Sequence, residues 1–336
     1  SIPISFYLFI IRKYKPLGNL LQKIGYRLYL AVNTFPFKVK GYWFPGEKWY
    51  VIPSLLVKRI VLFFANRRLL PTFIVKIIIA KGGWGNDSQK DWEKYSVVFA
   101  TKKGMVRKNK LIDVAKSGTR ELRDSGKLSI KLVSNDELVS VKLATQLDDV
   151  ILSSSSGKCL RFPLEKLRLF SGLNSSGVKG IKLDKNNFVI SQAILKHSLI
   201  DMNIRQEYLR SASENRKNIG KLKNGFEELS KNEEFLLAIT TKGSGKRSSA
   251  YEYRISNRGG KGITGIVTTE KNGNVIDCFV VTDNDQIILV SDKGQIIRVN
   301  VNQIRIAGRS TKGVSIFKIP HSNNIVSVSR IQEIEN

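Results

Sequence analysis

An apolar run that ends in a turn glycine recurs four times in this sequence of 336 residues. The four turn glycines are Gly104, Gly157, Gly243 and Gly294. A second glycine follows in each copy, and these four are Gly126, Gly177, Gly262 and Gly313. The steps between copies are 53, 86 and 51 residues for the first glycine and 51, 85 and 51 for the second. Two landmarks that keep the same step indicate a repeat architecture.

Each repeat reads as an apolar strand, a glycine turn, a strand with a basic residue, an irregular loop, a strand, an Asn/Asp turn and a last strand. Four short strands on a period of about 50 residues are typical of a propeller blade. One such sheet cannot bury both faces alone, so neighbouring blades must pack against it. We expect an all-β, propeller-like fold over 94–332, with about four four-stranded blades at 95–147, 148–196, 233–284 and 285–332.

Two segments stand outside this pattern. The long middle step holds an insertion, 197–230, whose apolar residues lie among charged ones, which predicts helix. A packing or linking role is favoured there over a partner site. Residues 1–90 hold 15 basic and 2 acidic residues and six of the eight prolines, without a consistent period. They are expected to be poorly ordered, either as sequence foreign to the fold, such as out-of-frame translation, or as a membrane-surface segment.

The chain has 56 Lys and Arg residues against 28 Asp and Glu, a formal net charge of +28. Such an excess favours a polyanionic partner. The apolar runs are too short for a membrane-spanning helix, and Cys159 and Cys278 form neither a disulfide framework nor a zinc motif. No metal site, P-loop or catalytic triad is recognised, and a cytoplasmic location with no cofactor in this chain is expected.

Basic residues recur at matched places in the repeats. Four residues after the turn glycine stands a cation in every copy, namely Lys108, Arg161, Arg247 and Arg298. Further cations accompany them in the strands and loops, namely Arg107, Arg168, Lys179, Lys246, Arg254, Arg258, Lys261, Arg305, Arg309 and Lys312. A cation repeated around a ring predicts a belt that binds a curved phosphate backbone without base reading. The alternative is that these charges only keep exposed edges soluble.

Several motifs resemble one known family. Gly243–Arg247, Glu252–Arg254 and Asn257–Ile263, with Gly157–Pro163 and Gly308–Val314 in other repeats, are similar to blade motifs of the C-terminal domain of the bacterial DNA gyrase A subunit. The resemblance covers 94–332 and implies a β-pinwheel that wraps duplex DNA for ATP-dependent negative supercoiling. The resemblance also implies two partners, the gyrase B subunit and a second A subunit. It places ATP and Mg in the partner subunit and the holoenzyme, not in this chain.

The sequence departs from the family in three respects. The gyrase box that usually precedes the first blade is missing, and Asn257–Gly262 is only box-like. Four blades are visible where the family usually has six. No tyrosine stands in the context of the nucleophile, so this chain alone is predicted not to cleave DNA. The corresponding domain of topoisomerase IV and a propeller that serves as a protein-interaction platform remain alternatives.

Overall fold

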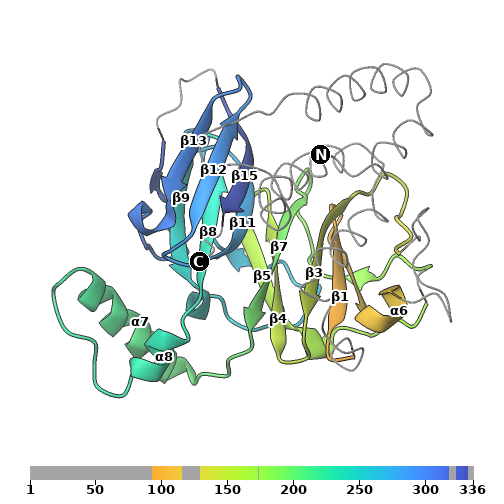
Figure 1. Cartoon of the computed structure of the whole chain (residues 1–336), viewed down its shortest axis with the longest axis horizontal. Coiled ribbons are helices and arrows are strands. Elements are labelled where there is room, and N and C mark those ends of the chain that lie inside the picture. Colours follow the sequence, from red (N-terminus) through yellow and green to blue (C-terminus); the bar gives the residue numbers. More distant parts are fainter. Residues whose placement is uncertain (1–92, 116–128, 173, 318–322, 332–336) are drawn as a thin grey trace, which may run out of the picture. The chain divides into compact units, whose positions relative to one another are not determined.

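The computed structural model (Figure 1) describes residues 93–115, 129–172, 174–317 and 323–331. Each of the four repeats contributes three strands to an antiparallel sheet of its own. The described residues lie within one compact unit, Val75–Glu121 with Leu128–Asn336. The prediction for residues 1–90 lies outside the described residues.

The strands follow the order predicted for each repeat. The first repeat contains β1 (Ser96–Thr101), β2 (Met105–Lys110), the short helix α6 (Leu111–Ala115) and β3 (Leu138–Ala144). The second contains β4 (Asp148–Ser154), β5 (Lys158–Pro163), the 3-10 helix η2 (Leu164–Lys166), β6 (Val178–Lys179) and β7 (Val189–Lys196). The third contains β8 (Phe235–Thr240), β9 (Ser244–Ser249), η3 (Ala250–Glu252), β10 (Ile263–Thr264) and β11 (Val275–Val281). The fourth contains β12 (Gln286–Ser291), β13 (Ile296–Asn300), η4 (Val301–Gln303), β14 (Val314–Ser315) and β15 (Ile325–Ile331).

The third strand of a repeat does not join its own sheet. Each two-residue strand pairs with the second strand of the preceding repeat, in the sheets β3-β1-β2-β6, β10-β5-β4-β7 and β11-β8-β9-β14. The registers match, because Val106 pairs with Val178, Cys159 with Ile263 and Gly245 with Val314. Every repeat with a described third strand therefore completes the blade before it.

The last blade differs from the prediction of four strands. Its described sheet has three strands, in the order β13-β12-β15, so β13 lies at an edge. The two residues of the first repeat that correspond to a donated strand, Lys127 and Leu128, lie outside the described residues.

The core lies between blades, as the apolar runs require. The central strands β1, β4 and β8 are buried along almost their whole length. Adjacent blades cover both faces of the sheets that contain β4 and β8. Separate hydrophobic clusters fill the three junctions, with Val98 and Phe162 in the first, Ile151 and Cys278 in the second, and Leu237 among the buried residues of the third. The strands β3, β7, β11 and β15 lie side by side in sequence order, as in a propeller of four blades.

The insertion between the second and third repeats is helical, with α7 (Met202–Arg216) and α8 (Glu227–Lys231). Asp201 caps α7 by accepting hydrogen bonds from the backbone N–H groups of Asn203 and Ile204. Tyr208 packs edge-on against Tyr251 of η3, with ring centroids 5.6 Å apart. The insertion is thereby anchored to the third repeat.

Candidate nucleic-acid interface

The cation four residues after the turn glycine is buried in three of the four repeats. Lys108, Arg161 and Arg247 are 3%, 4% and 5% exposed. Isolated parallel bridges join each of them to a loop of the following repeat, at Leu169, Ile255 and Ile306. The prediction that these three cations face outward is wrong, because the following repeat covers the strand that carries them.

Arg161 shows what such a buried cation does. Its Nε donates to the carboxylate of Asp149 at 2.7 Å, and its two Nη atoms donate to the backbone oxygens of Ala250 and Lys196 at 2.9 Å each. Asp149 is fully buried and also lies 2.7 Å from Nδ1 of His197. The guanidinium is thus paired with a carboxylate inside the protein, and each of its three nitrogens donates a hydrogen bond, which ties blade 2 to the third repeat.

Lys108 and Arg247, like Arg161, bind acceptors of the following repeat inside the protein. The Nζ of Lys108 donates to the backbone oxygen of Leu164 at 2.8 Å, and burial lowers the pKa of this lysine. The Nε of Arg247 donates to the backbone oxygen of Ile304 at 2.7 Å, and an Nη atom pairs with Asp283. Each cation therefore satisfies a carbonyl at or beside the short 3-10 helix of the next repeat.

The neighbouring cations Arg107 and Lys246 are fully buried as well. Arg107 donates to the backbone oxygens of Ser175 and Gly172. Lys246 donates to the backbone oxygens of Gly308 and Arg309 at 2.5 and 2.6 Å, and burial lowers its pKa to about 8. Their predicted place on an exposed belt is also wrong, because both bind loops of the following repeat.

Arg298 is the exposed member of this recurring set. Its Nε donates to the side-chain oxygen of Gln286 on the neighbouring strand β12. The described residues provide no following repeat that covers it.

A second recurring set of cations does face solvent. Arg168, Arg254 and Arg305 are exposed, and each follows the residue that ends a 3-10 helix. Those preceding residues, Leu167, Tyr253 and Ile304, are 1%, 2% and 3% exposed. A buried apolar anchor thus fixes the backbone from which each arginine projects, and the three occupy equivalent positions in successive repeats.

More exposed cations gather where the second and third repeats meet. The loop that carries Arg258 and Lys261 crosses the segment around Lys179, since the Gly259 N–H donates to the Gly180 oxygen at 2.6 Å and an Nη atom of Arg258 donates to the Lys179 oxygen at 3.3 Å. All three side chains are exposed. Lys182, which the sequence did not single out, is exposed beside them, and its N–H donates to the Gly260 oxygen at 2.8 Å.

The corresponding loop of the fourth repeat carries Arg309 and Lys312. Arg309 is half-buried and donates to the backbone oxygen of Thr264 at 2.9 Å, whereas Lys312 is exposed. The box-like segment Asn257–Gly262 is therefore one of several matched interblade loops.

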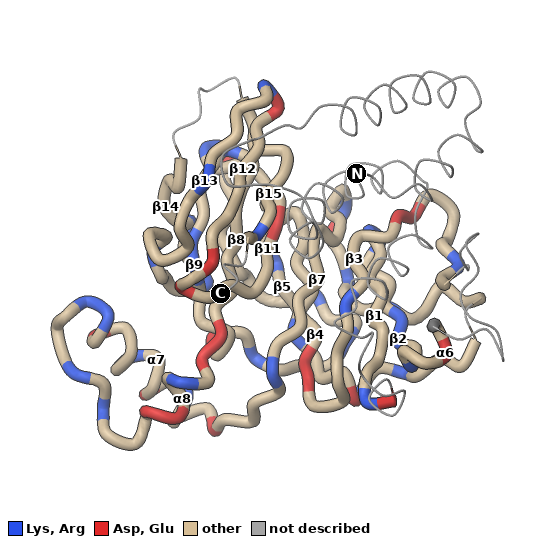
Figure 2. Tube along the Cα trace, in the orientation of Figure 1, with Lys and Arg blue, Asp and Glu red and all other residues tan. Residues whose placement is uncertain are grey.

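The exposed cations keep their charge available. Among the described residues, no ion pair involves Arg168, Lys179, Lys182, Arg254, Arg258, Lys261, Arg305 or Lys312. The nearby acid Asp184 pairs instead with Lys158 at 2.5 Å, which lowers the pKa of Asp184. Figure 2 shows Lys and Arg in all the described blades and their connecting loops.

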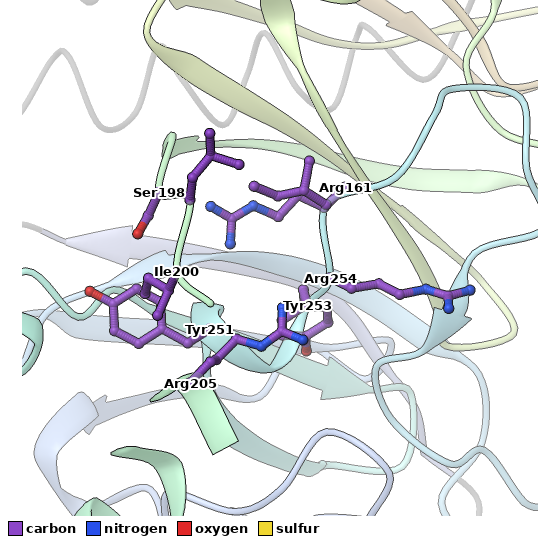
Figure 3. Close-up of a pocket in the computed structure, with 9 residues that line it drawn as sticks. Arg161, Ser198, Ile200, Arg205, Tyr251, Tyr253 and Arg254 are labelled. Carbon is purple, nitrogen blue, oxygen red and sulfur yellow. The ribbon is translucent and has the colours of Figure 1, made fainter. Parts of the chain in front are cut away.

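A small cavity of about 260 Å³ lies beside this surface, between the insertion and the loop after η3. It is lined by Arg161, Ser198, Leu199, Ile200, Arg205, Tyr251, Tyr253, Arg254 and Ile255. Figure 3 shows the side chains of Arg161 and Arg254 pointing in different directions. Arg161 is already paired with Asp149, and its side chain and that of Arg254 do not converge, so the cavity offers no convergent set of charges for a small anion.

The described residues give little support for other chemistry. Tyr208 is fully buried and donates to Glu233 at 2.8 Å, and burial raises its pKa. Within the described part of the chain, no group of three or more His, Cys, Asp and Glu side chains could hold a metal ion. None of the helices in that described part is long and apolar enough to span a membrane.

Comparisons with known proteins agree with this architecture. Residues 148–193, 234–282 and 285–332 match the family model described as the DNA gyrase C-terminal domain, β-propeller. The DNA gyrase A subunit of Rickettsia felis is 36% identical over 259 residues, which cover 73% of this chain and 28% of that protein. The DNA gyrase A subunit of Escherichia coli K12 is 32% identical over 241 residues, which cover 72% of this chain and 23% of that protein. The predicted resemblance is confirmed, and the chain spans about a quarter of the length of these relatives.

Solved structures support the fold. The C-terminal domain of DNA topoisomerase IV aligns with a TM-score of 0.56 and 20% identity, covering 74% of this chain and 64% of that one. A DNA gyrase A C-terminal domain aligns with a TM-score of 0.53 and 20% identity, covering 75% and 74%. The all-β, propeller-like prediction is thereby confirmed.

Proposed function

We propose, on the premise that this chain carries a domain of the DNA gyrase A C-terminal type, that the domain binds and curves duplex DNA. The observation that carries the proposal is the recurrence of Arg168, Arg254 and Arg305, exposed at equivalent positions of three successive repeats. Guanidinium groups without acidic partners suit phosphate oxygens, which accept two parallel hydrogen bonds.

The second group of contacts comes from the interblade loops. These loops carry further exposed cations, namely Lys179, Lys182, Arg258, Lys261 and Lys312. Cations that follow the blades meet the phosphate backbone at several points, so binding favours curved DNA and needs no base reading. Bending a short duplex costs about 1 to 6 kcal/mol, which several phosphate contacts with counterion release offset.

The larger assembly is proposed by likeness to the relatives. We infer that the domain acts as the non-catalytic part of a cytoplasmic type II topoisomerase that introduces negative supercoils. The holoenzyme would contain ATP with Mg, the gyrase B subunit, and a second A subunit. The described tyrosines near the insertion are buried, which supports the proposal that this chain alone does not cleave DNA.

Two triple variants that remove the same amount of charge from different places test the interface. Replacement of Arg168, Arg254 and Arg305 with Gln removes three phosphate contacts, so the log-log salt slope of duplex binding should become shallower by about 3. The control replaces Lys217, Lys221 and Lys231 of the insertion with Gln, which removes the same charge from exposed positions. Salt titrations by filter binding measure both.

Equal slopes for the two triple variants would contradict the arginine interface. A slope near zero in the unmodified protein would instead favour a protein-interaction platform. Curvature is tested separately, by relaxing circular DNA in the presence of the protein and measuring the change in linking number. An unchanged linking number at saturating protein would contradict wrapping.

A further inference from the structure

The outer edge of each second strand is a repeated docking site. In the first three blades, the following repeat closes that edge at three backbone positions. The turn-glycine oxygen accepts two N–H groups, as Gly104 does from Gly180 and Ile181 at 2.8 and 3.3 Å. The residue two positions later pairs with the donated strand, and the cation four positions later accepts an N–H, as Lys108 does from Phe170 at 2.9 Å.

The same three attachments occur at the next two junctions. Gly157 and Gly243 accept N–H groups from Gly265 and Ile316 at 2.8 and 2.9 Å. Arg161 and Arg247 accept N–H groups from Ser256 and Ala307 at 3.0 and 2.8 Å. The edge is therefore a template of constant geometry.

In the fourth blade, no described residue occupies this template. The equivalent positions are Gly294, Ile296 and Arg298. Ile296 is 65% exposed, whereas its counterparts Val106 and Cys159 are 0% and 4% exposed. The Ser291 N–H donates to the Gln295 oxygen, so alternation along the strand directs the N–H and C=O of Ile296 away from β12.

The first repeat carries the complementary part. Its sequence Gly126-Lys127-Leu128-Ser129-Ile130 corresponds to Gly177–Ile181, which supplies the strand donated to blade 1. The residues that follow are held as in the other donors, since Ile130 is 1% exposed like Ile181. The Lys131 N–H also donates to Ser175, as Lys182 donates to Gly260.

We propose that the edge of β13 binds the first-repeat donor segment of a second copy of this chain, which gives head-to-tail association. Ile296 is 65% exposed and pairs with no strand of the described residues, which suits this edge to a strand from a second copy. By the register of the other junctions, Ile296 pairs with Lys127 of the second copy. Such a contact is heterologous and continues from copy to copy unless it closes on itself. This inference is independent of DNA binding.

Two variants each disable one half of the contact. Ile296→Pro removes an N–H that points outward, so the β12–β13 ladder is kept. Gly126→Val blocks the donor, because a Cβ at the equivalent Gly262 and Gly313 meets the acceptor oxygens of Cys159 and Gly245 at 2.6 and 2.8 Å. Ile296→Thr, which keeps the N–H, and Gly220→Val, at an uncrowded glycine, are the matched controls.

Sedimentation velocity of the full chain over a concentration series gives the readout. We expect the unmodified chain and both controls to associate beyond pairs as concentration rises, and each disabled variant to stay monomeric. An equimolar mixture of the two disabled variants should form pairs and nothing larger, because it contains one working donor and one working acceptor. A monomeric unmodified chain, association of either disabled variant, or a mixture that stays monomeric would overturn the proposal.

Hydrogen exchange on the unmodified chain tests the same contact without any substitution, so it still gives an answer if a variant misfolds. The amide of Ile296 should exchange more slowly as concentration rises, while exposed amides of the insertion stay unchanged. Exchange at Ile296 that does not depend on concentration would overturn the proposal.

Discussion

At the scale of single residues, the buried cations act as ties between consecutive repeats. Arg161 makes three hydrogen bonds, one to Asp149 and two to backbone oxygens, and one of those oxygens belongs to Ala250 in the next repeat. A long, fully charged side chain is suited to this position because its fork of donors reaches several acceptors at once.

Removal of this tie should be costly. Arg161→Ala leaves the carboxylate of Asp149 buried without its arginine, and we expect the free energy of unfolding to fall by about 3 to 5 kcal/mol. Urea denaturation measures the change. Arg254→Ala, at an exposed position, is the control and should change stability by less than about 0.5 kcal/mol while weakening DNA binding. Equal losses of stability in Arg161→Ala and Arg254→Ala would contradict the role of Arg161 as a tie between repeats.

A half-buried carboxyl group predicts a dependence on pH. Asp277 on β11 accepts the Cys278 N–H at 2.7 Å, and burial raises its pKa to about 6 from the ordinary value of 3.8. Between these values the folded state holds more protons than the unfolded one, so this group makes stability fall as pH rises from about 4 to 6. The total effect is on the order of 2 to 3 kcal/mol.

Asp277→Asn removes this titration. The variant should therefore be more stable than the unmodified chain above pH 6, and the difference should vanish near pH 4. The midpoints of urea unfolding between pH 4 and pH 6 measure this difference in stability. The titration of the other acidic residues affects both proteins equally, so it drops out of the comparison. A difference that stays constant with pH would refute the role of Asp277.

At the scale of elements, the donated strands depend on a close backbone approach. Gly262 precedes β10 at a φ of +74°, and a Cβ there would lie 2.6 Å from the Cys159 oxygen of β5. Such a position accepts only glycine, because both the conformation and the space exclude a side chain.

Gly262→Ala should therefore detach β10 from β5. Gly259→Ala is the matched control, because Gly259 has a similar φ of +82° but no backbone atom closer than 3.8 Å. We expect Gly262→Ala to cost at least about 2 kcal/mol and the control about 1 to 2 kcal/mol for the conformation alone. Exchange of the Cys159 amide should speed up only in the first variant. Identical behaviour of the two variants would rule out the close approach as the cause.

Sequence patterns predicted the fold better than the site. The glycine steps indicated four repeats because each blade needs the same turns at the same places. They could not show that Val178–Lys179 completes the preceding sheet, since a two-residue strand carries no period of its own. The burial of Arg161 also escaped prediction, because its partner is a backbone oxygen 89 residues away. A usable signal for the exposed set does exist: Arg168, Arg254 and Arg305 each stand between two apolar residues, and the first of each pair is buried.

At the scale of the whole molecule, no described blade buries its own faces. All three hydrophobic clusters of the blade array lie between neighbours, so loss of one blade uncovers the next. We expect the described blades to unfold together. Native-state hydrogen exchange should give the same unfolding free energy for β4 and β8, and Arg161→Ala should lower both equally. A drop confined to β4 would show that the blades open separately.

The donation of strands also sets an order for folding during synthesis. Blade 1 lacks the partner of β2 until Val178–Lys179 has emerged from the ribosome, and blade 2 lacks the partner of β5 until Ile263–Thr264 has followed. Each of the first three blades is thus finished by the repeat that follows it in the chain. The helical insertion lengthens the second of these delays, so the nascent chain carries an incomplete second blade for longer than an incomplete first one.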